Sequence, residues 1–162
     1  MSARDTITIA VTLFAIAIGL FIINYMGTTV VDQLTAAPVI NESSGAVTAI
    51  SSIDTVVARL DLMVLALFFG LVLGLLITSW FIGGHPVFMV VYGIFCMLTV
   101  LISSILTNVW EQFVAVTILA STLAAFPITN HLMTNFPVYM VVVSFIGFLV
   151  MFAKPYITEG GI

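Results

Sequence analysis

The feature that most constrains this chain is a run of 21 residues, 62–82, that contains no charged side chain. As an α-helix rising ~1.5 Å per residue, such a run spans the ~30 Å hydrocarbon core of a bilayer. Residues 7–31, 87–107 and 138–153 are also dominated by apolar side chains. Repeated runs of this length predict a polytopic membrane protein built from helices.

The composition excludes several other classes of protein. Of the 162 residues, 62% are hydrophobic and 6% are charged, against about 45–50% and about 25% in soluble domains. This excludes an ordinary soluble domain and a disordered chain. Three Lys and Arg residues in total cannot form a phosphate-binding surface, so we expect the lipid bilayer, and no nucleic acid, as a partner.

We expect four transmembrane helices in a single membrane domain that covers residues 1–162. The first is predicted near residues 6–27. Its apolar part is longer than the ~7–15 apolar residues of a signal peptide, which favours a transmembrane helix. The second covers 62–82 and ends at a Gly-Gly-His-Pro turn. The third covers 87–107 and ends at a polar break, 109–112, and the last covers 138–153 before Lys154.

Residues 32–61 form the most polar stretch, predicted as a loop followed by an amphipathic helix. The loop covers 35–45, and Ser43 or Ser44 is suited to cap the helix that follows. Spacings of three and four define the apolar stripe of this helix, which consists of Val47, Ile50, Ile53, Val57 and Leu60. We expect this helix either to lie on the membrane surface or to stand on it and run directly into the next span.

Residues 113–126 form an apolar run of 14 residues, shorter than the lower limit of ~17 for a crossing. We expect one short buried or re-entrant helix here, followed by a polar connection over 126–137 that is bounded by prolines. Adding residues 109–112 brings the run near the limit, so five crossings stay open as an alternative. Cytoplasmic loops are enriched in Lys and Arg, and four crossings put Arg4 and Lys154 together on that side.

Small residues recur every fourth position in the second span, at Ala66, Gly70, Gly74 and Thr78. Such a stripe lets two helix backbones approach closely in lipid. It predicts helix packing, either within this chain's own bundle or in an oligomer. Leu71 and Leu75 lie about 100° further round the helix, and we expect them to face lipid or loosely packed neighbours.

A second stripe of small residues, Thr117, Ser121 and Ala125, predicts that the short helix is buried against protein. The third span also carries small and hydroxyl side chains. Hydroxyls in such helices usually bond to their own backbone, and the alternative is a polar pore lining. The residues concerned are Gly93, Cys96, Ser103, Ser104 and Thr107.

No motif in the sequence carries recognisable chemistry. His85 and His131 stand alone, without a second ligand at metal-binding spacing, and no nucleophile or phosphate-binding motif is present, so we expect no enzyme, metal or cofactor. Glu111 is the one acid between two apolar runs, and it either carries protons or marks a helix end at the interface. Asn41 begins an Asn-Glu-Ser acceptor pattern for glycosylation, or it belongs to an unmodified turn.

The residues Trp80-Phe81-Ile82-Gly83-Gly84-His85-Pro86, the stretch 126–137 and the tail 150–154 resemble small hydrophobic proteins encoded by viruses of microbes. The resemblance covers the last half of the chain and is to multi-span proteins of tailed-virus genomes or of icosahedral virions with an internal lipid membrane. It implies a structural protein of a viral membrane, with other membrane or capsid proteins as partners, and it carries over no functional residue.

Three functions are therefore compatible with the sequence. The first is a structural or accessory subunit of a larger membrane assembly. The second is a holin-like pore former, and the third is a subunit of a respiratory or transport complex with Glu111 in a proton path.

Overall fold

The computed structural model describes residues 4–38, 43–82 and 86–159. Every element within those ranges is helical. Four helical segments are long and apolar enough to cross a membrane, namely Ile7–Thr35, Ser44–Phe81, Val90–Val114 and Phe136–Ala153. The all-α fold class and the four membrane-spanning helices are thus confirmed, as expected of a multi-pass membrane protein.

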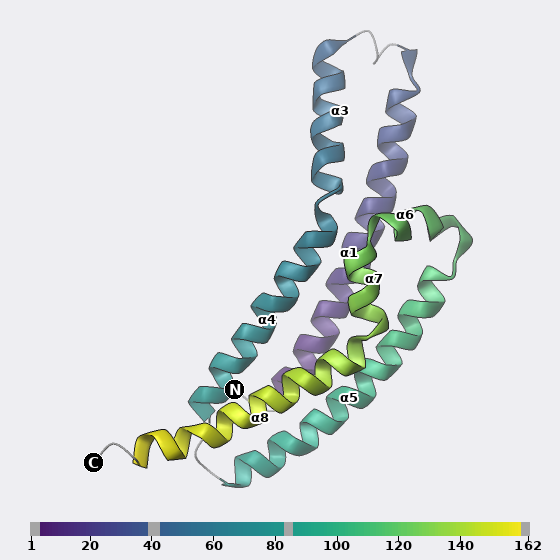
Figure 1. Cartoon of the computed structure of the whole chain (residues 1–162). Coiled ribbons are helices and arrows are strands. Elements are labelled where there is room, and N and C mark those ends of the chain that lie inside the picture. The colour runs from purple at the N-terminus through teal and green to yellow at the C-terminus, as the bar shows by residue number, and fades with distance from the viewer. Residues whose placement is uncertain (1–3, 39–42, 83–85, 160–162) are drawn as a thin grey trace.

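The first half of the chain is a long helical hairpin (Figure 1). Helix α1 (Arg4–Thr35) extends eight residues beyond its predicted end. Helix α3 (Ser44–Val57) returns alongside it and leads through a short turn into α4 (Leu60–Ile82). Of the two expected placements of the amphipathic helix, the structure therefore has the one that runs directly into the next span. Residues 24–35 of α1 and α3 project past the other helices, and we call this pair the arm.

The amphipathic helix α3 is only partly as predicted. The Ser43 hydroxyl caps it by accepting a hydrogen bond from the Ala46 N–H at 3.4 Å, as expected. Ile50 and Val57 are buried, but Val47 and Ile53 are 44% and 48% exposed. Fewer residues of the predicted stripe are buried than expected. Among the described long helices, α1 is the one that packs closely along α3.

Helix α5 (Pro86–Val114) continues through the polar break predicted at 109–112. The prediction of a break was wrong, because Trp110 within it is fully buried. Its ring stands edge-on to Phe21 of α1, with ring centroids 5.5 Å apart. The tertiary contact keeps this part of the chain helical and inside the bundle.

The short helix expected over 113–126 is divided, and the connection expected over 126–137 is largely helical. A 3-10 turn (Thr117–Leu119) and α6 (Ala120–Ala125) are followed by α7 (Pro127–Thr134). Pro127 occupies the start of α7, where a missing N–H costs nothing. With six and eight residues, α6 and α7 are too short to cross a bilayer. The chain therefore turns back at this point, and the alternative of five crossings is not observed.

Helix α8 (Phe136–Glu159) begins earlier and ends later than predicted. It packs against α5 and α4, which in turn both pack against α1, so the four long helices form a ring. Helix α1 begins and α8 ends at the same end of this bundle, opposite the arm (Figure 1).

An aromatic cluster lies where the bundle meets α6 and α7. The Phe21 ring makes edge-on contacts with Trp110, Phe113 and Phe126, at centroid distances of 5.4–5.5 Å. Each such pair contributes ~0.5–1.5 kcal/mol beyond area burial. Outside the bundle, large apolar side chains such as Phe81 and Met97 are more than 70% exposed, which suits a surface that faces lipid.

Candidate functional site

The most constrained polar group in the described chain is the carboxylate of Asp61, in the first turn of α4. Asp61 is 5% exposed. It accepts hydrogen bonds from the Ile128 and Thr129 N–H groups at 3.0 and 2.7 Å and from the Thr129 hydroxyl at 2.6 Å. These donors lie at the start of α7, where the adjoining Phe126 offers no side-chain cap. The partial positive charge at a helix N-terminus stabilises a nearby carboxylate. Asp61 of α4 therefore supplies the side-chain cap that α7 lacks.

Helix α5 holds α7 from a second side. The Trp110 indole N–H donates to the Asn130 side-chain oxygen at 3.1 Å. The Thr107 hydroxyl donates to the Met133 carbonyl at 2.9 Å, near the end of α7 where carbonyls have no helical partner. Both ends of α7 are therefore satisfied by side chains of spanning helices, which fixes the helix on the bundle.

Asn24 anchors the base of the arm. It is 1% exposed, and its side-chain N–H donates to the carbonyl of Val57, the last residue of α3, at 3.1 Å. The bond joins α1 to the turn between α3 and α4. Its side-chain oxygen makes no hydrogen bond with any described residue.

A cluster of polar side chains lies deep between the spans, where α4, α5 and α8 meet. The hydroxyls of Tyr92 and Ser144 are buried and make no hydrogen bond within the described chain. The Ser79 hydroxyl donates to the Leu75 carbonyl at 2.8 Å. A methyl group at Gly147 would overlap the Tyr92 hydroxyl, so the glycine provides the space that Tyr92 occupies.

The first stripe of small residues faces outward. Ala66, Gly70 and Gly74 are exposed, and nothing lies within 4 Å of a Cβ built at either glycine. Thr78 is half-buried and bonds to the Leu75 carbonyl of its own helix at 2.9 Å. Packing of this stripe within the chain's own bundle is therefore not observed.

The expectation that Leu71 and Leu75 face lipid or loosely packed neighbours was wrong for Leu75. Leu75 is 4% exposed and Leu71 packs against the core. Leu75 therefore fills the bundle interior, and Gly70 and Gly74 are left on the outside.

The second stripe of small residues is not buried against protein. Thr117, Ser121 and Ala125 are all exposed. The prediction of this stripe assumed one regular helix. The 3-10 turn before α6 interrupts the four-residue spacing. Within α6 it is Thr122 that is buried.

The hydroxyls of the third span mostly bond to their own helix. Ser103 and Ser104 both donate to the Val100 carbonyl, at 2.8 and 3.0 Å. Thr107 instead reaches α7. Since these groups are used within the fold, they do not form a continuous polar lining.

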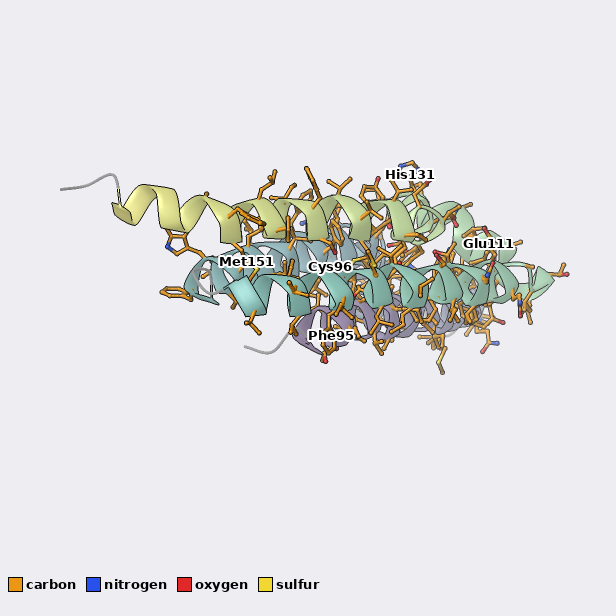
Figure 2. The ribbon with its side chains drawn as sticks, turned by 90° about the horizontal axis from the view of Figure 1, so that it is seen from below. Phe95, Cys96, Glu111, His131 and Met151 are labelled. Carbon is orange, nitrogen blue, oxygen red and sulfur yellow. The ribbon has the colours of Figure 1, made fainter. Side chains whose placement is uncertain are left out.

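The remaining candidate residues are dispersed. Glu111 and His131 are exposed and lie toward the same end of the molecule (Figure 2). The His131 ring stands edge-on to Tyr139, with centroids 6.3 Å apart. Asn41 and His85 lie outside the described residues. Within the described ranges no three His, Cys, Asp or Glu side chains are grouped in a way that could hold a metal ion.

Sequence reasoning missed the roles of Asp61, Asn24 and Trp110. A signal was present for each, because each is a hydrogen-bonding side chain inside or directly beside an apolar run. Polar groups at membrane depth need partners, but their partners are up to 68 residues away, and the sequence does not indicate them. No protein-family model, curated protein or solved structure matches this chain.

Proposed function

We propose that this protein is a non-enzymatic subunit of a larger membrane assembly, with a structural or accessory role. The observation that carries the proposal is the outward face of α4. Ala66, Gly70 and Gly74 lie there in the open, beside a shallow groove of about 480 Å³ that is also lined by Met63 and Leu67.

Helices in a bilayer associate through close packing of small residues, because apolar burial gives no net driving force there. A glycine in a helix costs ~1 kcal/mol relative to alanine. Two glycines that face only lipid would bear this cost without a packing gain, so a helix of another subunit is the partner that best suits this face.

The finer form of the proposal is a virion membrane, with membrane or capsid proteins as partners. It is supported by the resemblance of residues 80–86 and 126–137 to viral membrane proteins. A proton path through Glu111 is less favoured, because Glu111 is exposed and the buried acid Asp61 is engaged by α7. A pore is less favoured because the outward face of α4 is apolar around its glycines.

The test enlarges the small residues on α4. Gly70→Leu with Gly74→Leu separates a helix that packs on this face, and overpacking costs ~1–3 kcal/mol per site. Two sites weaken association by a factor of ~30 or more, since ~1.4 kcal/mol is tenfold. The readout is the size of the detergent-solubilised assembly on native gels. The control, Val138→Phe with Val142→Phe, adds bulk to an exposed face of α8 and should leave the assembly intact.

Mass spectrometry of the native particle that contains the chain identifies the partners. Capsid or other virion proteins in stoichiometric amounts would support the virion membrane. A particle that consists of one copy of this chain and lipid, for the wild type and for both variants, would contradict the proposed role in an assembly.

A further inference from the structure

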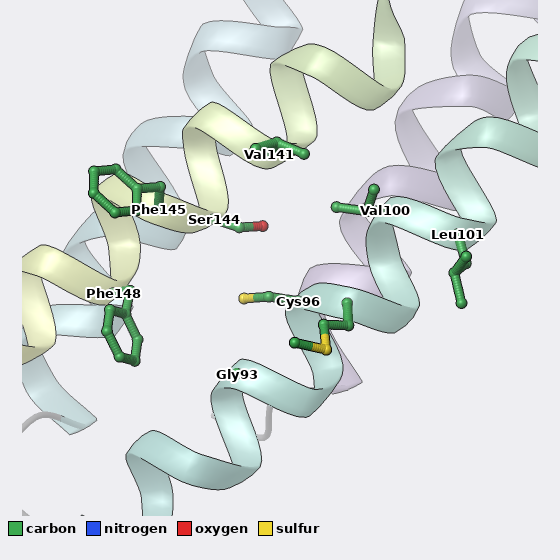
Figure 3. A pocket seen from close by; sticks show the side chains of 9 residues that line it. Gly93, Cys96, Val100, Leu101, Val141, Ser144, Phe145 and Phe148 are labelled. Atoms are coloured by element: carbon green, nitrogen blue, oxygen red, sulfur yellow. The ribbon is translucent and has the colours of Figure 1, made fainter.

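The outward face of α4 continues onto α3, before the start of the apolar run 62–82. The groove between α5 and α8 (Figure 3) differs in this respect, because its lining residues all lie within two spans. Positions seven residues apart lie only ~20° apart around a helix and so share one face. From Gly70, this spacing defines a row of exposed residues. We call this row the outer stripe, and it consists of Ala49, Val56, Met63, Gly70 and Ile77.

The turn between α3 and α4 keeps the outer stripe continuous, although the helix axis bends there (Figure 1). The Ala58 N–H donates to the Asp54 carbonyl at 2.9 Å, and the Met63 N–H donates to the Arg59 carbonyl at 3.2 Å. Both are the four-residue bonds of an α-helix, and Ala58 has α-helical backbone angles. Val56 and Met63 therefore lie on the same side of the chain.

The part of the outer stripe on α3 lies beyond the hydrocarbon. Residues 62–82 are enough to cross a core of ~30 Å, and the arm points away from the bundle (Figure 1). At ~1.5 Å per residue, Val56 lies ~9 Å and Ala49 ~20 Å before the start of this run. The headgroup layer on each side is only about 5–8 Å thick. Lipid chains therefore do not reach Val56, whose side chain is 55% exposed.

A cation without an ion pair stands on the same face. Arg59 follows Val56 by three residues and precedes Met63 by four, spacings that place residues side by side on a helix. Its side chain is exposed and forms no ion pair with the described residues. Asp61, two residues away, is engaged by the N-terminus of α7. The outer stripe therefore combines apolar side chains with one positive charge, just outside the run 62–82.

Neither a second copy nor lipid matches both features. Copies in one membrane share their orientation, and a two-fold axis between them brings the same residue of each face together. Arg59 would then meet Arg59 of the other copy, and like charges repel. An anionic headgroup pairs with Arg59 but leaves Val56 and Ala49 facing water. A protein helix with an acidic side chain covers the apolar residues and also neutralises the charge.

We propose that the partner on the outer stripe is a helix of a different protein, longer than the bilayer, that carries an Asp or Glu beside Arg59. From Ala49 to Ile77 the stripe is ~42 Å long, against ~30 Å of hydrocarbon. The partner helix follows α4 through the membrane and α3 beyond it. This inference rests on the proposed function, because it names the partner of the same face of α4.

Two pairs of variants of the full chain test the contact outside the membrane. Val56→Gln removes an apolar contact. Val47→Gln makes the same change on the opposite side of α3, since nine residues turn a helix by ~180°, and the two valines are 55% and 44% exposed. Arg59→Glu reverses the charge, and Arg59→Lys keeps it. On native gels Val56→Gln and Arg59→Glu should lower the yield of the assembly several-fold, whereas Val47→Gln and Arg59→Lys should retain it.

The Arg59→Lys variant also captures the partner. A carbodiimide joins an amine to a carboxylate in direct contact, forming an amide bond with loss of water. Peptide mass spectrometry of the treated native assembly should find position 59 joined to an Asp or Glu of another protein. The wild-type chain, which has no amine at this position, is the control, and Lys154, its one lysine, is recognised by its own peptide.

Three results would overturn this inference. One is position 59 joined to an acid of a second copy. Another is a loss of assembly in Arg59→Glu but not in Val56→Gln, without a joined peptide, which would assign Arg59 to a lipid headgroup. The third is an assembly that survives both variants but is lost in Gly70→Leu with Gly74→Leu, because the contact then ends inside the membrane and the proposed function stands. An assembly that survives all of these variants would contradict the proposed function itself.

Discussion

Asp61 and Thr129, 68 residues apart, share two hydrogen bonds to one carboxylate oxygen, from the Thr129 N–H at 2.7 Å and its hydroxyl at 2.6 Å. Hydrogen bonds to ionised groups are stronger than neutral ones. Because Asp61 lies in the first turn of α4 and Thr129 in the first turn of α7, this contact ties the segment that turns back between α5 and α8 to the hairpin formed by the first half of the chain.

Replacing Asp61 should loosen that segment. Asp61→Ala leaves the Ile128 and Thr129 N–H groups without their acceptor. We expect the free energy of unfolding to fall by at least the ~1.5–3 kcal/mol of one hydrogen bond to a charged group. Thermal unfolding in detergent measures the change. Asp54→Ala removes an exposed acid of α3 and should stay within about 0.5 kcal/mol of the wild type. Equal stability of the two variants would show that the Asp61 contact contributes little.

Gly147 and Tyr92 should behave as a coupled pair. Gly147→Ala places a methyl group on the Tyr92 hydroxyl, and overpacking of this kind costs ~1–3 kcal/mol. Tyr92→Phe removes a buried hydroxyl that has no hydrogen-bond partner, so alone it should be neutral or stabilising. In the double variant the phenylalanine makes room for the methyl group, and the cost of Gly147→Ala should largely disappear.

A double-mutant cycle of unfolding free energies measures this coupling. Additive effects of the two substitutions would mean that Tyr92 moves aside, and that the glycine is not needed for the tyrosine.

Two glycines at the arm should respond oppositely to leucine. A Cβ at Gly27 of α1 would lie 3.0 Å from a methyl group of Val57, which is buried. Gly27→Leu should therefore separate α1 from the end of α3 and destabilise the protein by ~1–3 kcal/mol.

Gly45, in the first turn of α3, has nothing within 4 Å. Gly45→Leu should be neutral or stabilising by up to ~0.8 kcal/mol, the difference in helix propensity. Thermal unfolding compares the two, and a loss of stability in both would indicate that Gly45 also has a packing role.

The direction of the chain across the membrane can be measured with single cysteines in a Cys96→Ala background. Ser52→Cys lies on the exposed side of the arm, while Thr6→Cys and Thr158→Cys lie near the start of α1 and the end of α8. In sealed vesicles an impermeant maleimide should label Ser52→Cys from one side and the other two from the opposite side. Labelling of Ser52→Cys and Thr158→Cys from the same side would instead require a fifth crossing.

The sequence by itself determined the class of protein and the number of spans. Both depend on a local quantity, the length of an apolar run relative to the bilayer, and residues 62–82 predicted α4 to within two residues of its start. The Ser43 cap followed in the same way, since its partner is three residues along the chain.

The tertiary structure alone decided which faces of the helices point inward and how the segment 115–135 folds. In water an apolar stripe marks the buried side of a helix, but in lipid both the interior and the outside of a bundle are apolar. The sequence of α4 therefore did not show that Leu75 faces the core and Gly74 the outside of the bundle. Likewise, α7 is a helix rather than a loop because Asp61 and Thr107 satisfy its ends, and such partners become known only when the helices are packed together.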